Sequence, residues 1–393
     1  MRTIFRFHIA FLIYLCFFPY MGAAQDSLIR HRPLEQLRFS GQFSGFLQYT
    51  PDFWLDFSAG GRYIPRLNYK IPFKKERLLD FEASANIYGS MDASLFSDSY
   101  FDHNIKAYRM WARYSNQRME LRFGLQKINF GSAQMFRPLM WFDRMDPRDP
   151  LQLTDGVWGF LGRYYFKNNT NIWLWGLYGN KNPKGFEATT TLKNFPEAGG
   201  RIQFPIPKGE AALSYHYRVT DPAKLYLPWS RPPYEQVGEH KTGFDIRINA
   251  IVGLWLEASW TCFNKDLGVY THQEMVTAGT DYTFGFGNGL VATFEQFVFS
   301  YDQNAFGFAN NTTVSALSLL YSLNIFDRLS LMTYRNWTDN QNFFFLIWEK
   351  QLNRLSFYVT GFWNPKNYFF PGQVGNSNRF AGKGVQVMAV WNM

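Results

Sequence analysis

The sequence of 393 residues contains little cysteine, and Cys16 and Cys262 are its only two. We expect Cys16 to be removed with the N-terminal segment described below, so the mature chain keeps one cysteine and no intramolecular disulfide. The sequence also has no CxxC, HExxH, haem-attachment or glycine-rich phosphate-binding motif. Disulfide-stapled domains and the common metal, haem and nucleotide sites are therefore not indicated, and we expect neither a cofactor nor a metal.

Long apolar runs and clustered charge are lacking too. After the N-terminus no apolar run approaches the roughly 18 residues that a membrane-spanning helix needs. Charged residues make up 18% of the chain, and the basic residues behind its formal charge of +9 are scattered. Nucleic-acid-binding proteins gather such residues into a patch or stripe. The sequence therefore argues against a helical membrane protein and against a nucleic-acid partner.

The N-terminus has the pattern of an export signal. Arg2 and Arg6 precede an apolar run over residues 9–18, and small residues follow as far as Ala24. This order is typical of a secretory signal peptide, and the run is too short to favour an uncleaved membrane anchor. The predicted organisation is a signal peptide over residues 1–24, a short periplasmic segment over residues 25–39, and one folded domain over residues 40–393.

That domain is rich in aromatic residues, which form 20% of the chain, and in strict alternation. In RMELRFGLQ (residues 118–126) polar and apolar side chains alternate with a period of two. The same period recurs in LLDFEASANI, GFDIRIN, EAALSYHYR and RLSFYVTGFW. A period of two predicts β-strands with one polar and one apolar face.

The connections between these strands favour a barrel over a soluble sandwich. We place eighteen strands in the sequence, and short turns alternate with longer loops such as 89–104, 127–155 and 179–197. Outer-membrane barrels have this asymmetry and an even strand number. In hydrocarbon every backbone polar group must be paired within the protein, which a closed sheet achieves. The predicted fold class is all-β, a transmembrane antiparallel β-barrel of about 18 strands, with 16 as the alternative.

Two of the predicted strands are apolar on both faces. They are NIWLWGLY (residues 171–178) and VSALSLLYS (residues 314–322). A strand that faces lipid on one side and water on the other needs only one apolar face. We therefore expect the barrel to pack something against these strands from inside, such as its own loop.

Two segments carry a resemblance to a known group of proteins. The alternating last strand, GKGVQVMAVWNM, resembles that of bacterial outer-membrane porins, although it ends in Met393 rather than Phe or Trp. The segment LRFGLQKINFGSAQMFRP resembles the region of large Gram-negative porins and alginate-export-type channels where a strand leads into a loop folded into the lumen. The resemblance implies a location in the outer membrane, contact with its lipid, and an inward-folding loop over about residues 127–155.

That loop contains RPLMWFDRMDPRDPLQLTDG (residues 137–156), with three arginines, four aspartates and three prolines in twenty positions. In porin-like proteins such a loop narrows the pore, and prolines stiffen it. The candidate constriction residues are Arg137, Asp143, Arg144, Asp146, Arg148 and Asp149. The alternatives are an external loop of mutually neutralising charges and a calcium site formed by the aspartates, against which the arginines would compete.

Arginines also recur on the faces assigned to the lumen. Arg109, Arg113, Arg122 and Arg163 lie on strands next to the charged loop and are candidate pore-wall residues. For most lumen arginines a network of salt bridges across the wall is the simpler interpretation. The local excess of positive charge nevertheless predicts a mild preference for anions.

Catalysis finds no support, because none of the histidines belongs to a recognisable nucleophile motif. We therefore predict that the chain is not an enzyme. The predicted function is a porin-like channel for passive diffusion of small hydrophilic solutes, anions among them, since barrels of sixteen to eighteen strands leave an aqueous channel. The alternative is a closed barrel that acts as a scaffold or partner-binding component of an envelope complex. The sequence indicates neither the solute nor the oligomeric partners.

Overall fold

The computed structural model describes residues 36–51, 56–93, 99–225, 233–367 and 379–393. The predicted signal peptide and most of the segment 25–39 lie outside these residues. The strands are β1 (Leu37–Tyr49), β2 (Phe57–Phe73), β3 (Arg77–Ala93), β4 (Ser99–Ser115), β5 (Met119–Gln126), β6 (Val157–Tyr165), β7 (Asn171–Leu177), β8 (Thr190–Thr191), β9 (Glu197–Ile206), β10 (Gly209–Asp221), β11 (Val237–Asn249), β12 (Gly253–Phe263), β13 (His272–Phe284), β14 (Leu290–Asp302), β15 (Asn310–Ser322), β16 (Asp327–Asn336), β17 (Gln341–Gln351), β18 (Leu355–Trp363) and β19 (Lys383–Asn392). Two short 3-10 helices, Pro222–Leu225 and Gly268–Tyr270, lie in loops.

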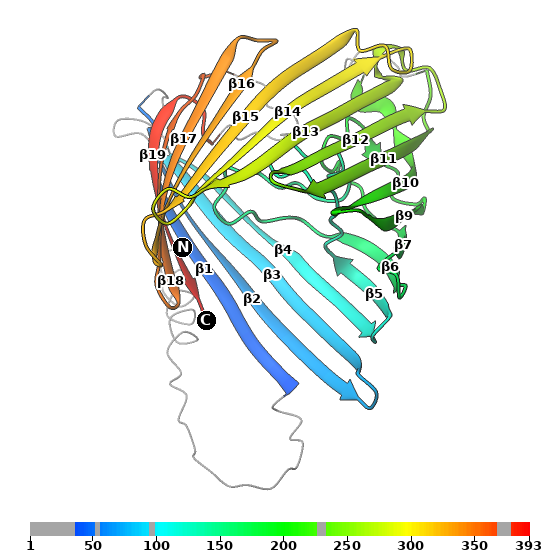
Figure 1. Ribbon diagram of the computed structural model, residues 1–393, viewed down its shortest axis with the longest axis horizontal. Helices are drawn as coiled ribbons and strands as arrows, with labels where there is room; N and C mark the ends of the chain where they lie inside the picture. The colour runs from blue at the N-terminus through cyan, green and yellow to red at the C-terminus, as the bar shows by residue number, and fades with distance from the viewer. Residues whose placement is uncertain (1–35, 52–55, 94–98, 226–232, 368–378) are drawn as a thin grey trace, which may run out of the picture. The chain divides into compact units, whose positions relative to one another are not determined.

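The strands form a closed ring (Figure 1). Each pairs antiparallel with its neighbours, and β1 closes the ring by pairing with both β2 and β19. β7 pairs directly with β9, because the two-residue β8 bonds only to the end of β10. The 19 strands less β8 leave 18 in the ring, which confirms the predicted all-β barrel. No helix among the described residues is long and apolar enough to cross a membrane.

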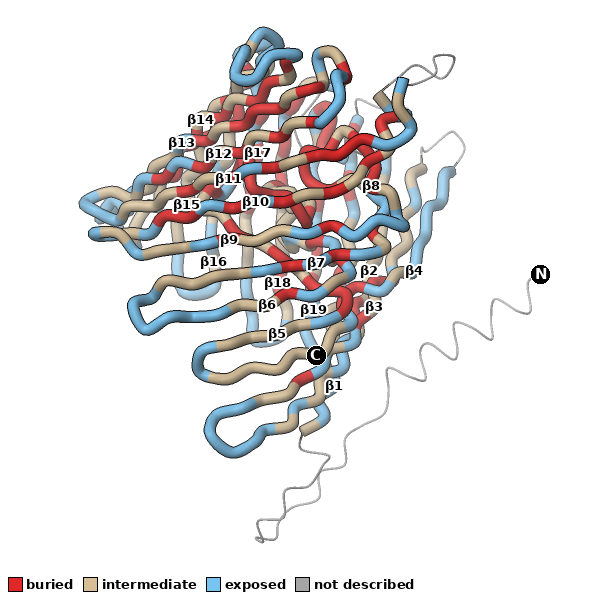
Figure 2. The backbone as a smooth tube through the Cα atoms, turned by 90° about the vertical axis from the view of Figure 1, so that its right-hand side faces the viewer, coloured by how far each residue is buried: buried red, intermediate tan, exposed pale blue. Residues whose placement is uncertain are grey.

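The barrel is apolar outside, and its inner face carries polar side chains along many of the strands. Along β10, Leu213 is 51% exposed and Tyr215 46%, whereas Ser214 is 4% exposed and His216 is fully buried. Figure 2 shows the same alternation of buried and exposed positions along other strands. Successive side chains of a strand point to opposite faces, so the period of two in the sequence becomes an outer and an inner face.

One predicted boundary was wrong. Residues 89–104 do not form a long loop, because β3 continues to Ala93 and β4 begins at Ser99. Ser90 pairs with Asp102, and the Ser58 hydroxyl donates a hydrogen bond to Asp92 on the neighbouring strand. Small polar residues here pair across the inner face, whereas in the sequence they had the composition of a turn.

The connections divide between the two ends of the ring. The short turns, 74–76, 116–118, 166–170, 207–208, 250–252, 285–289, 323–326 and 352–354, lie at one end, which we call the turn end. The two longest described connections, 127–156 and 178–196, leave from the other end, the loop end. These two loops determine the interior described next.

Candidate channel interior

The loop of residues 127–156 is bound to the opposite wall of the barrel by carboxylates. Glu295 on β14 accepts backbone hydrogen bonds from Gln134 at 2.6 Å, Met135 at 2.9 Å and Phe136 at 2.7 Å. The indole of Trp255 donates a fourth, at 3.1 Å. Glu295 is fully buried, so its charge is balanced by four N–H donors rather than by water.

A second carboxylate holds the same loop one strand pair away. Glu257 on β12 accepts hydrogen bonds from the backbone of Ala133 at 2.9 Å and of Leu139 at 2.7 Å. Gly131, at φ 103°, approaches so closely that a Cβ atom there would lie 2.3 Å from a carboxylate oxygen of Glu257. Only glycine fits this position, because other residues rarely adopt that φ and would collide with Glu257.

Apolar side chains of this loop pack with those of the barrel wall and other loops in two clusters inside the lumen. The first cluster consists of Met135, Phe136, Met140, Phe186, Met275, Phe297, Phe299, Val314, Ala316, Tyr334, Phe343, Phe345, Phe362 and Phe380. The second consists of Ile128, Phe130, Leu139, Trp141, Phe142, Val157, Leu161, Trp175 and Leu177. Both faces of β7 and β15 are apolar, which predicted that a loop packs against them from inside. β7 contributes Trp175 and Leu177 to the second cluster, and β15 contributes Val314 and Ala316 to the first. That prediction is confirmed.

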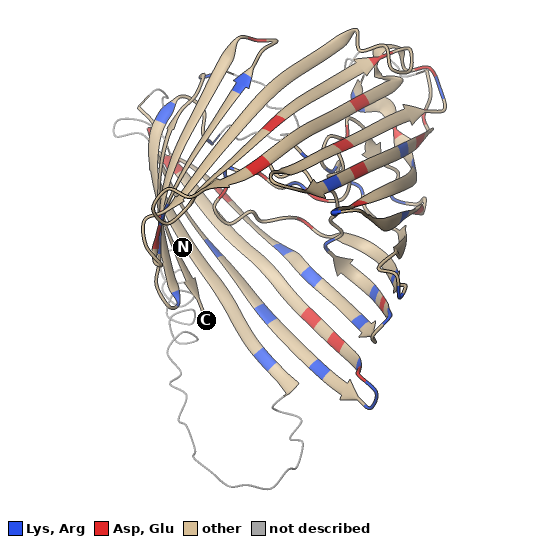
Figure 3. Cartoon of the chain, in the orientation of Figure 1, with Lys and Arg blue, Asp and Glu red and all other residues tan. Residues whose placement is uncertain are grey.

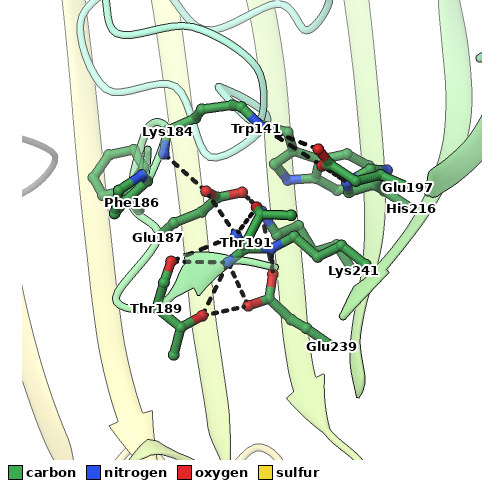
Figure 4. Close-up of polar contacts among 12 residues, drawn as sticks. Trp141, Lys184, Phe186, Glu187, Thr189, Thr191, Glu197, His216, Glu239 and Lys241 are labelled. Carbon is green, nitrogen blue, oxygen red and sulfur yellow. Dashed lines mark hydrogen bonds and ion pairs between the residues drawn. The ribbon is translucent and has the colours of Figure 1, made fainter. Parts of the chain in front are cut away.

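The loop of residues 178–196 is fixed by a buried charge network (Figure 4). Glu187 lies 3.0 Å from the guanidinium of Arg218 and 2.5 Å from the ammonium of Lys241. Glu239 accepts from Arg218 at 2.6 Å and lies 3.3 Å from Lys241. The two cations and two carboxylates balance, as buried charges must. This network ties the loop to β10 and β11.

The first two predicted constriction residues lie within protein packing. Arg137 donates hydrogen bonds to the carbonyl of Phe130 at 3.1 Å and to the Asn129 side chain. Asp143 lies 3.7 Å from the Arg137 guanidinium, and both side chains are buried. Burial raises the pKa of Asp143 above its ordinary value. These two residues brace the loop from within.

Arg144 and Arg148 join the loop to its surroundings. Arg144 donates a hydrogen bond to the carbonyl of Pro183 in the second loop. Arg148 binds both carboxylate oxygens of Asp146, at 2.8 Å each. Its guanidinium is buried 5.6 Å from the ring centroid of Phe345 on β17.

The predicted pore-wall residue Arg109 contacts the end of the loop. Its guanidinium donates to the backbone carbonyl of Thr154 at 2.9 Å and to the Thr154 hydroxyl at 3.0 Å. Arg109 is buried, and this contact fixes the loop against β4.

The structure brings the other three wall arginines together near the turn end. Arg113 binds both oxygens of Asp80, at 2.9 and 2.6 Å. Glu120 lies 2.9 Å from Arg122 and 3.6 Å from Arg163. Three guanidiniums thus share two carboxylates, which leaves one formal positive charge. Figure 3 shows basic residues on β1, β2 and β4 and acidic residues on β3.

In the described part of the chain, two cavities lie between the loop and the wall of β1–β4. The turn-side cavity has a volume of about 380 Å³ and is lined by Ser40, Gly41, Gln42, Ile64, Arg66, Tyr108, Leu151, Leu153, Asn392 and Met393. The loop-side cavity has about 30 Å³ and is lined by Ser44, Phe46, Gly61, Arg62, Tyr88, Gly89, Ser90, Asp149, Leu151, Arg379 and Met388. Of the predicted constriction residues, Asp149 alone lines either cavity, and burial raises its pKa above the ordinary value.

Sequence reasoning missed the function of the wall carboxylates. The alternation places Glu257 and Glu295 inside, but we expected them to pair with arginines. A signal was present, because residues 253–302 contain no arginine at all. Without an arginine on their own strands these carboxylates need other donors, and backbone amides of the inserted loop supply them.

The fold and interior define a closed antiparallel barrel whose lumen is narrowed by two of its own loops. No protein-family model matches the chain, and no curated protein matches it by sequence. Among solved structures, OccAB1 of Acinetobacter baumannii is similar with a TM-score of 0.54 and 10% identity, over 91% of this chain and 95% of that one. OpdQ of Pseudomonas aeruginosa has a TM-score of 0.52 and 11% identity, over 91% and 98%. At such identities the likeness concerns the fold alone, and it agrees with the predicted barrel.

Proposed function

We propose that the chain is a porin-like channel of the bacterial outer membrane through which small hydrophilic solutes diffuse passively. The observation that carries this proposal is the polar, partly open wall of β1–β4 inside a barrel whose outer face is apolar. Phe43, Leu47 and Phe123 are among the exposed apolar side chains of that outer face, at 49%, 67% and 69%. Lipid is the environment in which such a surface is stable. Residues 1–24 would supply the export signal.

The solute path follows the two cavities along β1–β4. The apolar clusters and the buried charge network occupy other parts of the described interior. The loop of residues 127–155 forms the constriction, with Asp149 facing the path and Arg137, Asp143, Arg144, Asp146 and Arg148 holding the loop in place. This division of roles is supported by the burial of Arg137, Asp143 and Arg148.

The path carries an excess of positive charge, which supports a preference for anions. Arg62 and Arg379 line the loop-side cavity against one carboxylate, that of Asp149. Near the turn end, Arg113, Arg122 and Arg163 share two carboxylates. Charged groups that line a narrow aqueous path set its ion selectivity.

Conductance in planar bilayers tests the function. Purified protein should give stepwise openings, with reversal potentials in a potassium chloride gradient that favour chloride. Preference for potassium would contradict the anion selectivity, and silence in every condition would contradict the channel. Liposome swelling with sugars and amino acids of graded size provides the solute range.

The second candidate, a closed barrel that serves as a scaffold, is favoured by the small loop-side cavity of about 30 Å³. A passage that narrow at one level leaves little room for solute. Silence in bilayers together with stable recovery of a partner complex from membranes would support the scaffold instead. In either case the chain is proposed to act without catalysis.

A further inference from the structure

The two cavities lie at consecutive levels of the same wall. Gln42 pairs with Ile64 and lines the turn-side cavity, whereas Ser44 pairs with Arg62 and lines the loop-side cavity. These pairs are next to each other among the inward-facing positions of β1 and β2. A solute that moves along this wall must therefore leave one cavity where the other begins.

One side chain of the inserted loop lines both cavities. Leu151 borders the turn-side cavity, together with Leu153 and Ile64, and also the loop-side cavity, together with Asp149 and Arg62. The Leu151 side chain therefore lies at the boundary between the two cavities, and each cavity also has polar or charged lining residues. An apolar constriction between polar compartments is a barrier to water and hydrated solutes.

The backbone around Leu151 is fixed by local hydrogen bonds. The Asp149 backbone N–H donates to the carbonyl of Asp146 at 3.1 Å, and that of Gln152 donates to the carbonyl of Asp149 at 3.0 Å. The Leu151 N–H donates to the Asp149 carboxylate at 2.9 Å. Pro147 and Pro150 occupy the second position of the two consecutive turns, where their fixed φ is favourable.

Both ends of this short segment are attached to the barrel. On one side the Arg148 guanidinium is buried against β17, 5.6 Å from the centroid of Phe345. On the other side Thr154 receives two hydrogen bonds from Arg109 on β4. The segment of residues 149–153 is therefore held at two points, and its central side chain stays at the cavity boundary.

We propose that Leu151 is the gate residue of this channel and sets the largest solute that passes between the two cavities. The proposal rests on the proposed channel function. It assigns the size limit to an apolar side chain rather than to the charged residues of the loop, which act on selectivity or on the attachment of the loop.

The test compares Leu151→Ala, Leu151→Trp and the matched control Leu153→Ala in planar bilayers and in liposome swelling. Leu153 has the same side chain, lies two residues away and lines only the turn-side cavity. Leu151→Ala should raise conductance about twofold and admit larger sugars, Leu151→Trp should lower conductance, and Leu153→Ala should leave the size limit unchanged. Circular dichroism and electrophoretic mobility without heating establish that each variant has folded.

The outcomes separate the gate from the channel. If the wild-type protein conducts but Leu151→Ala has the same conductance and size limit, the gate is refuted and the channel stands. If Leu153→Ala widens the size limit as much as Leu151→Ala, the assignment to Leu151 is also refuted. If all folded variants are silent, the proposed channel function itself fails.

Discussion

Carboxylates on the inner wall meet two kinds of partner. Glu120 forms ion pairs with Arg122 and Arg163, whereas Glu295 accepts hydrogen bonds from three backbone amides and an indole. The first arrangement adjusts the charge of the wall near the turn end. The second attaches a loop, because each amide that Glu295 accepts would otherwise be a buried donor without water. Glu120 and Glu295 both lie on the inner face, so the difference in their roles follows from the groups that they bind.

Removal of the Glu295 carboxylate should therefore destabilise the protein strongly. We expect Glu295→Ala to lower the free energy of unfolding by about 3–5 kcal/mol, because it leaves buried N–H groups without their acceptor. Urea unfolding in detergent, followed by tryptophan fluorescence, measures this difference. The matched control is Glu349→Ala, whose partner Arg328 is 47% exposed, and it should cost at most about 1 kcal/mol. Equal losses in the two variants would argue against the anchoring role of Glu295.

Asp149 should make ion selectivity depend on pH. Burial raises its pKa, so this carboxyl binds a proton at a higher pH than a surface aspartate does. Arg62 and Arg379 supply the positive charge of this cavity, and Asp146 and Asp92 are the other nearby carboxylates. Acidification from pH 7 to about pH 5 should therefore increase the anion preference in reversal-potential measurements. Asp149→Asn should show the larger preference at both pH values. A wild-type preference that does not change with pH would contradict this assignment.

At the scale of elements, the two long loops act as parts of the core. Loop 127–156 contributes side chains to both apolar clusters, and loop 178–196 joins β10 and β11 through the buried charge network. The two loops are also hydrogen-bonded to each other, because the Arg144 guanidinium donates to the Pro183 carbonyl and the Gly185 N–H donates to the Asp143 carbonyl. An insertion or deletion in either loop therefore disturbs the interior rather than the surface.

Disruption of the charge network should release the second loop. Arg218→Met leaves Glu187 and Glu239 buried without their main partner, which should cost about 3–5 kcal/mol. Limited trypsin digestion should then cut after Lys193 at a protease concentration that leaves the wild type intact. Arg247→Met is the control, because Arg247 and its partner Asp281 are each at least 25% exposed. Cleavage at equal rates in the two variants would mean that the network does not hold the loop.

The strands were predictable and the course of the loops was not. All 18 ring strands were placed from the sequence, most of them by alternation, since lipid outside and polar groups inside impose opposite requirements on successive residues. It also indicated, through β7 and β15, that something packs inside. Loop 127–156 has no periodicity, and its contacts with Glu257 and Glu295 join positions more than a hundred residues apart. Because the loop has no periodicity, nothing in the sequence indicated that Leu151, within the charged stretch, borders both cavities.

For the whole molecule, the interior is divided into unlike halves. An apolar cluster from β13 to β18 and from the loops fills one side, while polar and charged residues of β1–β4 line the two cavities on another. The proposed solute path and the larger apolar cluster therefore involve different strands. The outer face is apolar around the described ring and gives no sign of this division.

That outer face should respond to charge as a lipid-facing surface does. Leu346, in the middle of β17, is 48% exposed, and Leu346→Arg should destabilise the protein by about 2–4 kcal/mol in lipid vesicles. On a soluble protein an exposed substitution of this kind usually changes stability by about 0.5 kcal/mol or less. Gln351→Arg, at the end of the same strand, is the control and should cost about 1 kcal/mol at most. Denaturant titrations of vesicle-inserted protein give both values, and a negligible effect at Leu346 would contradict membrane insertion of β17.

The pairing of β1 with β19, which we call the seam, closes the ring and differs from the other strand pairings in the distance along the chain that it joins. Gln42 and Asn392, hydrogen-bonded across it, are 350 positions apart in the chain, whereas the other strand pairs of the ring join near neighbours. Bringing such distant ends together costs about 3 kcal/mol more in chain entropy than closing a hairpin. The seam is thus the strand pairing of the ring that costs the most chain entropy to form. A factor that binds β1 and β19 together would therefore shift the equilibrium between inserted and uninserted protein more than a factor that binds another part of the barrel.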